Sequence, residues 1–153
     1  MTEMKIAIGS DQWGFDFKKM IIDEFSGKGH EFIDVGTYSK EPVDYPNIAY
    51  TVAKKVSEGA CERGILICGT GIGMAVAANK VKGAYAAVCH DVYSTERSIL
   101  SNDANIMCMG ALIIGPKIVS SLVDLWLNLT FDANSNSAKK VEQIHLIERG
   151  VGV

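Results

Sequence analysis

The sequence predicts an α/β fold of three layers, in which a five-stranded parallel sheet lies between two layers of helices. Short apolar segments alternate five times with amphipathic segments of helical period along the chain. The apolar segments are nearly continuous, which is typical of strands that are buried on both faces of a parallel sheet. The length of 153 residues fits one domain. These features indicate a single Rossmann-like or flavodoxin-like domain over residues 1–153.

Each strand is expected to be followed by a helix. Residues 4–8, with the sequence MKIAI, form the first apolar segment, and residues 13–27 follow with Phe17, Ile21 and Phe25 on one helical face. The second unit has a strand at 31–35, a polar loop with two prolines and a helix at 48–58. The remaining strands are expected at 63–68, 84–89 and 105–109, and their helices at 72–80, 92–100 and 116–129.

A polar segment, DANSNS at residues 132–137, separates these five units from a last helix at about 138–149. This helix is expected to pack on a partner subunit. Hydrophobic residues make up 48% of the chain, which is slightly more than a free-standing domain needs and also favours a subunit interface.

Composition excludes several classes of protein. The net charge of −3 and the absence of a basic run longer than Lys-Lys argue against nucleic-acid binding. The longest apolar stretch, residues 104–114, is interrupted by Asn105 and Gly110, so no membrane span is expected. The N-terminal sequence has no basic segment before a long apolar one, which favours a cytoplasmic location. The four cysteines contain no CxxC pair, so reduced thiols are expected rather than disulfides or a metal site.

The strongest local motif is Cys68-Gly69-Thr70-Gly71-Ile72-Gly73, between a predicted strand and a predicted helix. Alternate glycines let the backbone approach a ligand and direct several N–H groups to one point, as an anion or oxyanion site requires. Met74 replaces the third glycine of the dinucleotide fingerprint, and the motif also lacks the Lys-Ser/Thr of a phosphate-binding P-loop. The alternative is that the glycines only permit close packing of helix and strand.

Cys68 would end its strand at a helix N-terminus, where a thiolate is stabilised and the cysteine pKa falls. By itself such a cysteine is more often a small buried apolar residue. Asp11 follows the first strand, where a carboxylate can orient hydroxyl groups or move protons, although it would equally cap the next helix. Thr70 can cap a helix or exchange a proton with a substrate oxygen, and Tyr45 can bind a ligand or simply pack.

Two further groups of polar residues adjoin predicted strands. His90 and Asp91 follow the fourth strand, as a possible acid/base and a natural helix cap. Asn102 and Asp103 precede the fifth strand, where an amide can hold a hydroxyl group or form an ordinary turn.

The motifs together resemble the type B ribose-5-phosphate isomerase and galactose-6-phosphate isomerase family. The matching segments run in order along nearly the whole chain: Gly9-Ser10-Asp11, Asp34-Val35-Gly36-Thr37-Tyr38, Val43-Asp44-Tyr45-Pro46, residues 64–73, Ala77-Ala78-Asn79-Lys80 and Asn102-Asp103-Ala104-Asn105. The resemblance implies metal-free and cofactor-free aldose–ketose isomerisation of a sugar or sugar phosphate. It also implies a homodimer with shared active sites, often paired into tetramers.

The resemblance implies the following site. Cys68 is the base that removes the proton next to the carbonyl, the amides of residues 69–73 hold the enediolate oxygen, and Thr70 assists proton exchange. Asp11 and Asn102 bind hydroxyl groups, and Tyr45 lines the pocket. The substrate-binding residues are expected to be Gln12, Tyr45, Gly69, Gly71, Ile72, Gly73, Ser101, Asn102 and Lys140.

Departures from the family pattern concern ring opening and phosphate binding. Gln12 and Ser101 stand where the family has histidines, and the second of those histidines is the ring-opening acid. Leu112 replaces an arginine, and in the DANSNSAKK segment only Lys140 stands near an expected cation. The substrate is therefore expected to differ from ribose 5-phosphate and to be acyclic or readily opened, unless His90 or Asp11 takes over ring opening.

Two other functions remain open at this stage. A non-catalytic sugar-binding paralogue, or one subunit of a hetero-oligomeric isomerase, would explain the lost polar residues. A flavin or nucleotide module is disfavoured because the first strand–helix loop has no phosphate cradle.

Overall fold

The computed structural model describes residues 3–152. Its centre is a sheet of five parallel strands in the order β2-β1-β3-β5-β4. The sequence prediction of a five-stranded parallel sheet is confirmed. The strands are β1 (Lys5–Ser10), β2 (Glu31–Asp34), β3 (Arg63–Cys68), β4 (Ala86–Val88) and β5 (Ile106–Gly110).

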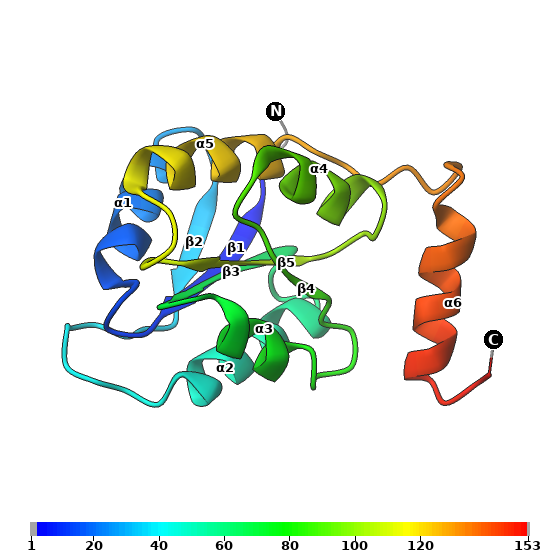
Figure 1. Ribbon diagram of the computed structural model, residues 1–153, viewed down its shortest axis with the longest axis horizontal. Coiled ribbons are helices and arrows are strands. Elements are labelled where there is room, and N and C mark those ends of the chain that lie inside the picture. The colour runs from blue at the N-terminus through cyan, green and yellow to red at the C-terminus, as the bar shows by residue number, and fades with distance from the viewer. Residues whose placement is uncertain (1–2, 153) are drawn as a thin grey trace.

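Helices cover both faces of the sheet (Figure 1). One layer holds α1 (Phe15–Ser26), α4 (Val92–Leu100) and α5 (Pro116–Leu127), and the other holds α2 (Tyr45–Ser57) and α3 (Ile72–Ala78). Successive residues of a strand point to opposite faces, so each strand serves two cores. In β1, for example, Ile6 and Ile8 join the core under α1 and α5, and Ala7 joins the core under α2.

The element bounds differ from the sequence prediction at a few ends. Helix α2 begins at Tyr45 rather than residue 48, because Pro46 is favourable in a first helical turn. Helix α1 begins at Phe15, after a turn in which Gly14 packs against Ile67 so closely that a Cβ would lie 2.6 Å from its side chain. Strand β4 has only three residues, Ala86–Val88, and lies at the sheet edge.

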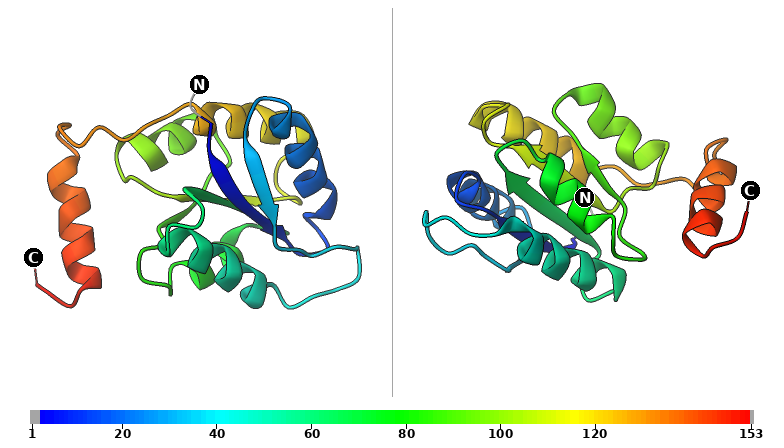
Figure 2. Two further views of the ribbon diagram at one scale, coloured as in Figure 1. Left: turned by 180° about the vertical axis from the view of Figure 1, so that it is seen from behind. Right: turned by 60° about the horizontal axis from the view of Figure 1, so that its bottom comes forward.

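Helix α6 (Ala138–Glu148) stands apart from the three layers at the end of an extended linker (Figures 1 and 2). Its last turns reach the segment before β4. The ring of His145 stacks on Tyr85 at 4.8 Å, and the Glu148 carboxylate accepts hydrogen bonds from the Tyr85 hydroxyl and from Gly83 N–H. None of the helices within residues 3–152 combines the length and apolar character that crossing a bilayer requires.

A buried lysine fixes the loop between β2 and α2. Lys18 is fully buried, and its Nζ lies 2.7 Å from Asp34 Oδ1 and also donates to the carbonyl of Thr37. Asp34 Oδ1 accepts a second hydrogen bond from Gly36 N–H. Because the buried charge is paired and hydrogen-bonded, the loop that leads to Tyr45 has a defined start.

Candidate active site

The candidate site lies where the carboxyl ends of β1 and β3 meet. Strand β1 has β2 on one side and β3 on the other, so the strand order reverses here. Helices α1 and α3 leave these two strands toward opposite faces of the sheet. In open α/β sheets such a point is where a ligand crevice is expected. The N–H of Asp11 donates to the carbonyl of Ile67 at 3.1 Å, which joins the Asp11 loop to the Cys68 loop.

The backbone of residues 68–73 is shaped around the sulfur of Cys68. Cys68 is buried, and the N–H of Gly71 donates to its Sγ at 3.1 Å. A donor in this position stabilises negative charge on sulfur. Gly71 has a left-handed φ of 80°, and a Cβ there would lie 2.9 Å from the Met109 carbonyl carbon. Only glycine therefore fits this position without strain.

The polar residues Thr70 and Tyr45 border this loop. Thr70 is exposed, and its Oγ1 accepts the N–H of Ile72 at 3.3 Å. A Cβ on Gly73 would lie 2.5 Å from the Tyr45 hydroxyl oxygen, so Tyr45 lies directly against the first turn of α3. The glycine at position 73 thus makes room for the tyrosine, which is a second use besides access for a ligand.

The other three cysteines have different surroundings. All four thiols are free and buried. Burial raises the pKa of Cys61 and Cys89, and that of Cys108 well above its usual value. A thiol held protonated in this way is a poor base. Cys68 is the cysteine that combines a crevice position with a backbone N–H on its sulfur.

Asp11 has the capping role that the sequence allowed. Its Oδ1 accepts hydrogen bonds from the N–H groups of Trp13 at 2.9 Å and Gly14 at 3.2 Å. Burial raises the pKa of Asp11, and these two hydrogen bonds partly offset the rise. Capping occupies Oδ1, and the backbone bond from Asp11 to Ile67 places the residue beside the Cys68 loop.

Gln12 also has a structural contact. Its Oε1 accepts the N–H of Val43 at 3.2 Å and so joins the loops after β1 and β2. The interaction holds the segment before Tyr45 close to the rim of the crevice.

Three predicted substrate residues lie elsewhere in the same chain. Ser101 and Asn102 follow α4 and precede β5, at the amino edge of the sheet. Gly110, at the other end of β5, pairs with Cys68, and the strand between them alone spans about 13 Å. The Ser101 hydroxyl accepts from Arg97 Nε at 2.7 Å. Lys140 is exposed on α6, outside the three layers.

Two apolar side chains lie beside the glycine loop. A Cβ on Gly69 would lie 3.3 Å from Leu112 Cδ1 and 3.6 Å from Trp13 Cδ1. Leu112 is 61% exposed and Trp13 56%. The sequence prediction did not place Trp13 in the site, although its position directly after Asp11 and Gln12 was a usable signal.

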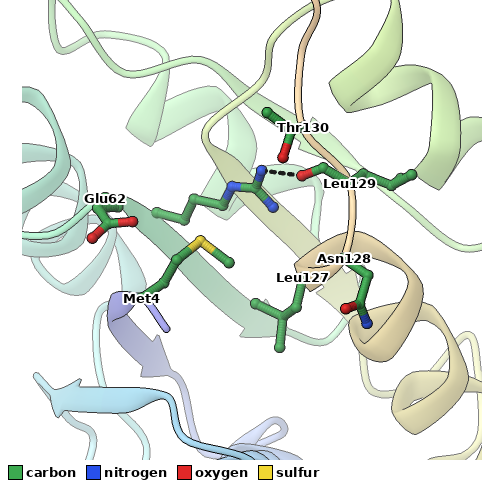
Figure 3. A pocket seen from close by; sticks show the side chains of 7 residues that line it. Met4, Glu62, Leu127, Asn128, Leu129 and Thr130 are labelled. Atoms are coloured by element: carbon green, nitrogen blue, oxygen red, sulfur yellow. Dashed lines mark hydrogen bonds between the residues drawn. The ribbon is translucent and has the colours of Figure 1, made fainter. Parts of the chain in front are cut away.

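A cavity of about 510 Å³ lies at the opposite, amino edge of the sheet (Figure 3). Met4, Glu62, Leu127, Asn128 and Thr130 line it, together with Leu129 and Arg63. The Arg63 guanidinium donates to the carbonyls of Trp126 at 2.6 Å and Leu129 at 2.5 Å. These carbonyls lie in the last turn of α5 and just beyond it, so the arginine caps a helix C-terminus.

Within residues 3–152, no three side chains of the metal-ligating types His, Cys, Asp and Glu come together as a metal site. The crevice instead offers a thiol, a carboxylate, a hydroxyl and several backbone N–H groups.

Comparison with known proteins gives the family that the motifs resemble, over most of the chain. The model of the Ribose/Galactose Isomerase family matches residues 6–144. Ribose-5-P isomerase B of Listeria innocua is 52% identical over 136 residues, which are 89% of this chain and 92% of the relative. D-erythrulose-4-phosphate isomerase 2 of Mycolicibacterium smegmatis is 44% identical over 92% of this chain and 95% of the relative.

The fold also matches that of solved structures from this family. The solved structure of Clostridium thermocellum ribose-5-phosphate isomerase B superposes with a TM-score of 0.92 at 44% identity, and the match covers 96% of this chain and 99% of that one. The protein belongs to the ribose/galactose isomerase family of aldose–ketose isomerases.

Proposed function

We propose that this isomerase acts on an acyclic four-carbon sugar phosphate, of which D-erythrulose 4-phosphate is the ketose. The observation that carries the proposal is Ser101 in place of the ring-opening histidine. In a tetrose 4-phosphate, the ester occupies the oxygen that would close a five-membered ring, so the sugar is already open. Ribose 5-phosphate has that hydroxyl free and must be opened first. The similarity to the M. smegmatis enzyme supports the same substrate class.

The reaction proceeds in this proposal through a cis-enediol. Cys68 removes the proton from the carbon next to the carbonyl and returns it to the neighbouring carbon. N–H groups of the 69–73 loop stabilise the enediolate oxygen. Within that loop the N–H groups of Gly71 and Ile72 already donate to Cys68 Sγ and Thr70 Oγ1. Thr70 transfers the proton between the two oxygens, and Asp11 orients the substrate hydroxyl groups and moves their protons.

The apolar pair Trp13 and Leu112 bears on where the phosphate lies. Neither side chain carries a charge, and both flank Gly69. A phosphate is usually held by cationic side chains, and these two residues supply none. Lys140 is the candidate, but it lies on α6, outside the three layers.

We infer that two copies of the chain complete each other's sites. A second copy would bring its Ser101, Asn102 and Lys140 to the crevice, which a single chain does not do. Apolar side chains are exposed on two helices that follow the carboxyl edge of the sheet: Ile72 and Val76 on α3, and Val92 and Tyr93 on α4. Exposed apolar residues are common at subunit interfaces, and a homodimer is the simplest symmetric solution. The free thiols also favour a cytoplasmic location.

Substrate assays on the purified protein test the proposal. In D₂O, proton NMR should show deuterium at the carbon next to the carbonyl, with conversion between D-erythrulose 4-phosphate and its aldose. We expect kcat/KM for this pair to exceed that for ribose 5-phosphate. A preference for ribose 5-phosphate would contradict the substrate. Binding of sugars without exchange would favour a non-catalytic subunit instead.

Restoring the missing family residues should shift the preference. The double variant Ser101→His/Leu112→Arg is expected to raise the ratio of kcat/KM for ribose 5-phosphate over the tetrose phosphate by about 10- to 100-fold, because it adds an acid and a charged hydrogen-bond donor. Val151→Arg adds the same charge at a residue that is 51% exposed beyond α6, and it should leave the ratio unchanged. If the wild type, the double variant and Val151→Arg all have the same ratio of kcat/KM values, residues 101 and 112 do not determine substrate specificity.

Replacing Asp11 separates its two roles. Asp11→Asn keeps an oxygen that accepts the N–H groups of Trp13 and Gly14, so Tm should change little. The neutral amide cannot move protons, and kcat/KM is expected to fall by about 100-fold or more. Asp11→Ala removes the cap as well and should cost about 1 kcal/mol of stability in addition. Full activity of Asp11→Asn would leave capping as its whole function.

A further inference from the structure

His90 is held at the carboxyl edge of the sheet by a single backbone contact. It is the second residue after the end of β4, and the N–H of Gly110, at the end of β5, donates to its Nε2 at 2.8 Å. Because Nε2 accepts, it carries a lone pair, and the proton of the neutral ring lies on Nδ1. The Nε2 atom therefore accepts a backbone hydrogen bond and has no proton to donate as an acid.

Gly110 is one of the residues through which β5 contacts the 68–73 loop. It pairs with Cys68 in the sheet register, and the N–H of Ala111 donates to the Cys68 carbonyl at 2.8 Å. A Cβ on Gly110 would lie 2.7 Å from Thr70 Cα and 2.8 Å from the Gly69 carbonyl oxygen. The two backbones thus touch without a side chain between them, so a shift of Gly110 must shift Gly69 and Thr70.

We propose that His90 is a positioning residue, which acts through Gly110 to hold Gly69 and Thr70 in the geometry that stabilises the enediolate. The inference rests on the proposed role of the 68–73 loop. An oxyanion site depends on N–H groups that are fixed before the reaction, and small displacements of such groups are costly. His90 supplies the lateral support from β4, the strand on the far side of β5.

The surroundings keep the ring neutral, as this bond requires. Burial lowers the pKa of His90, and the adjacent Asp91 carboxylate partly offsets that effect. Asp91 itself accepts the N–H of Ser94 at 2.7 Å and caps α4. The residues of α3 contain no titratable side chain, α4 contributes Tyr93, Glu96 and Arg97, and the facing loop contributes the Cys68 thiol.

Two variants of similar size test the proposal. His90→Gln retains an oxygen that can accept the Gly110 N–H, and His90→Leu does not. We expect kcat of His90→Leu to fall on the order of 10- to 100-fold with a much smaller change in KM. His90→Gln should recover most of the loss. Equal kcat values for the two variants, or a change in KM alone, would overturn the proposal.

His30 provides a matched control. It is buried at the amino edge of the sheet, where its Nδ1 accepts the N–H of Met4 at 3.3 Å. His30→Leu removes a comparable histidine–backbone bond far from the crevice, so it should lower Tm and leave kcat unchanged. If His30→Leu lowers kcat as much as His90→Leu, the effect of the latter is only a loss of stability.

A measurement on the unaltered protein covers the case in which His90→Leu does not fold. In ¹⁵N-labelled protein at neutral pH, the Nε2 of His90 should have the chemical shift of an unprotonated ring nitrogen and Nδ1 that of a protonated one. The reverse assignment would remove the Gly110 contact. The kinetic assays use D-erythrulose 4-phosphate, or ribose 5-phosphate if the wild-type protein prefers it. The role of His90 is then tested on whichever substrate the wild type accepts, so a wrong substrate proposal does not decide the test of His90.

Discussion

Replacement of Cys68 by serine is expected to lower kcat by about 10³- to 10⁴-fold without loss of the fold. The mechanism needs a base that is ionised at neutral pH, and a serine hydroxyl is far less acidic than a thiol. Serine is nearly the same size, and its oxygen can accept the Gly71 N–H that now donates to sulfur. The loop should therefore keep its conformation, so the fall in kcat would reflect the loss of the base and not a change in structure.

Cys61→Ser is the matched control for this variant. Cys61 is also buried and free, but it precedes β3 at the amino edge of the sheet, and burial raises the pKa of its thiol. Its replacement should leave kcat intact and alter Tm at most. Steady-state kinetics and circular dichroism of the two variants measure both quantities. More than a tenth of wild-type kcat in Cys68→Ser would assign proton abstraction to another group, with Asp11 the next candidate.

The layers of the fold could be predicted because burial determines where apolar residues occur in the sequence. Strand β5 is apolar throughout, and β3 is apolar after Arg63, because both of their faces are covered. The amphipathic period of α1 identifies its buried face through Ile21 and Phe25. The order of the strands across the sheet is not marked by any such pattern of apolar residues. Strand β5 enters between β3 and β4, and only the short, half-exposed β4 hints that it is the edge strand.

Part of the candidate site could likewise be predicted from the sequence, and part of it could not. Cys68, Thr70 and Asp11 follow strands, and parallel strands bring their carboxyl ends to one edge, so their proximity could be predicted. The bond from Gly110 to His90 could not, because it depends on the pairing of β4 with β5. Ser101 and Asn102 precede a strand, which places them at the opposite edge in any parallel sheet. Their assignment to the site came from family resemblance, and we propose that a second chain brings them there.

Mixing two inactive proteins is expected to restore activity if the sites are shared. Cys68→Ala lacks the base, and Asn102→Ala lacks a hydroxyl-binding amide from the other edge of the sheet; each is expected to be nearly inactive alone. In a mixed dimer, one site receives Cys68 from one chain and Asn102 from its partner, and the second site lacks both. Random assortment makes half of the dimers mixed, so an equimolar mixture refolded together should reach about one quarter of wild-type kcat.

A mixture of Cys68→Ala with Asp11→Asn is the decisive control, since Cys68 and Asp11 belong to the same rim of one chain. Every site in that mixture lacks one of the two residues, and no activity should return. Recovery in the first mixture alone would show that the amino edge of one chain completes the crevice of another. Failure of both mixtures, with mixed dimers present by native mass spectrometry, would mean that Asn102 acts within its own chain or not at all. A substantially active Asn102→Ala protein would remove that amide from the site directly, and the partner's contribution would then rest on Lys140.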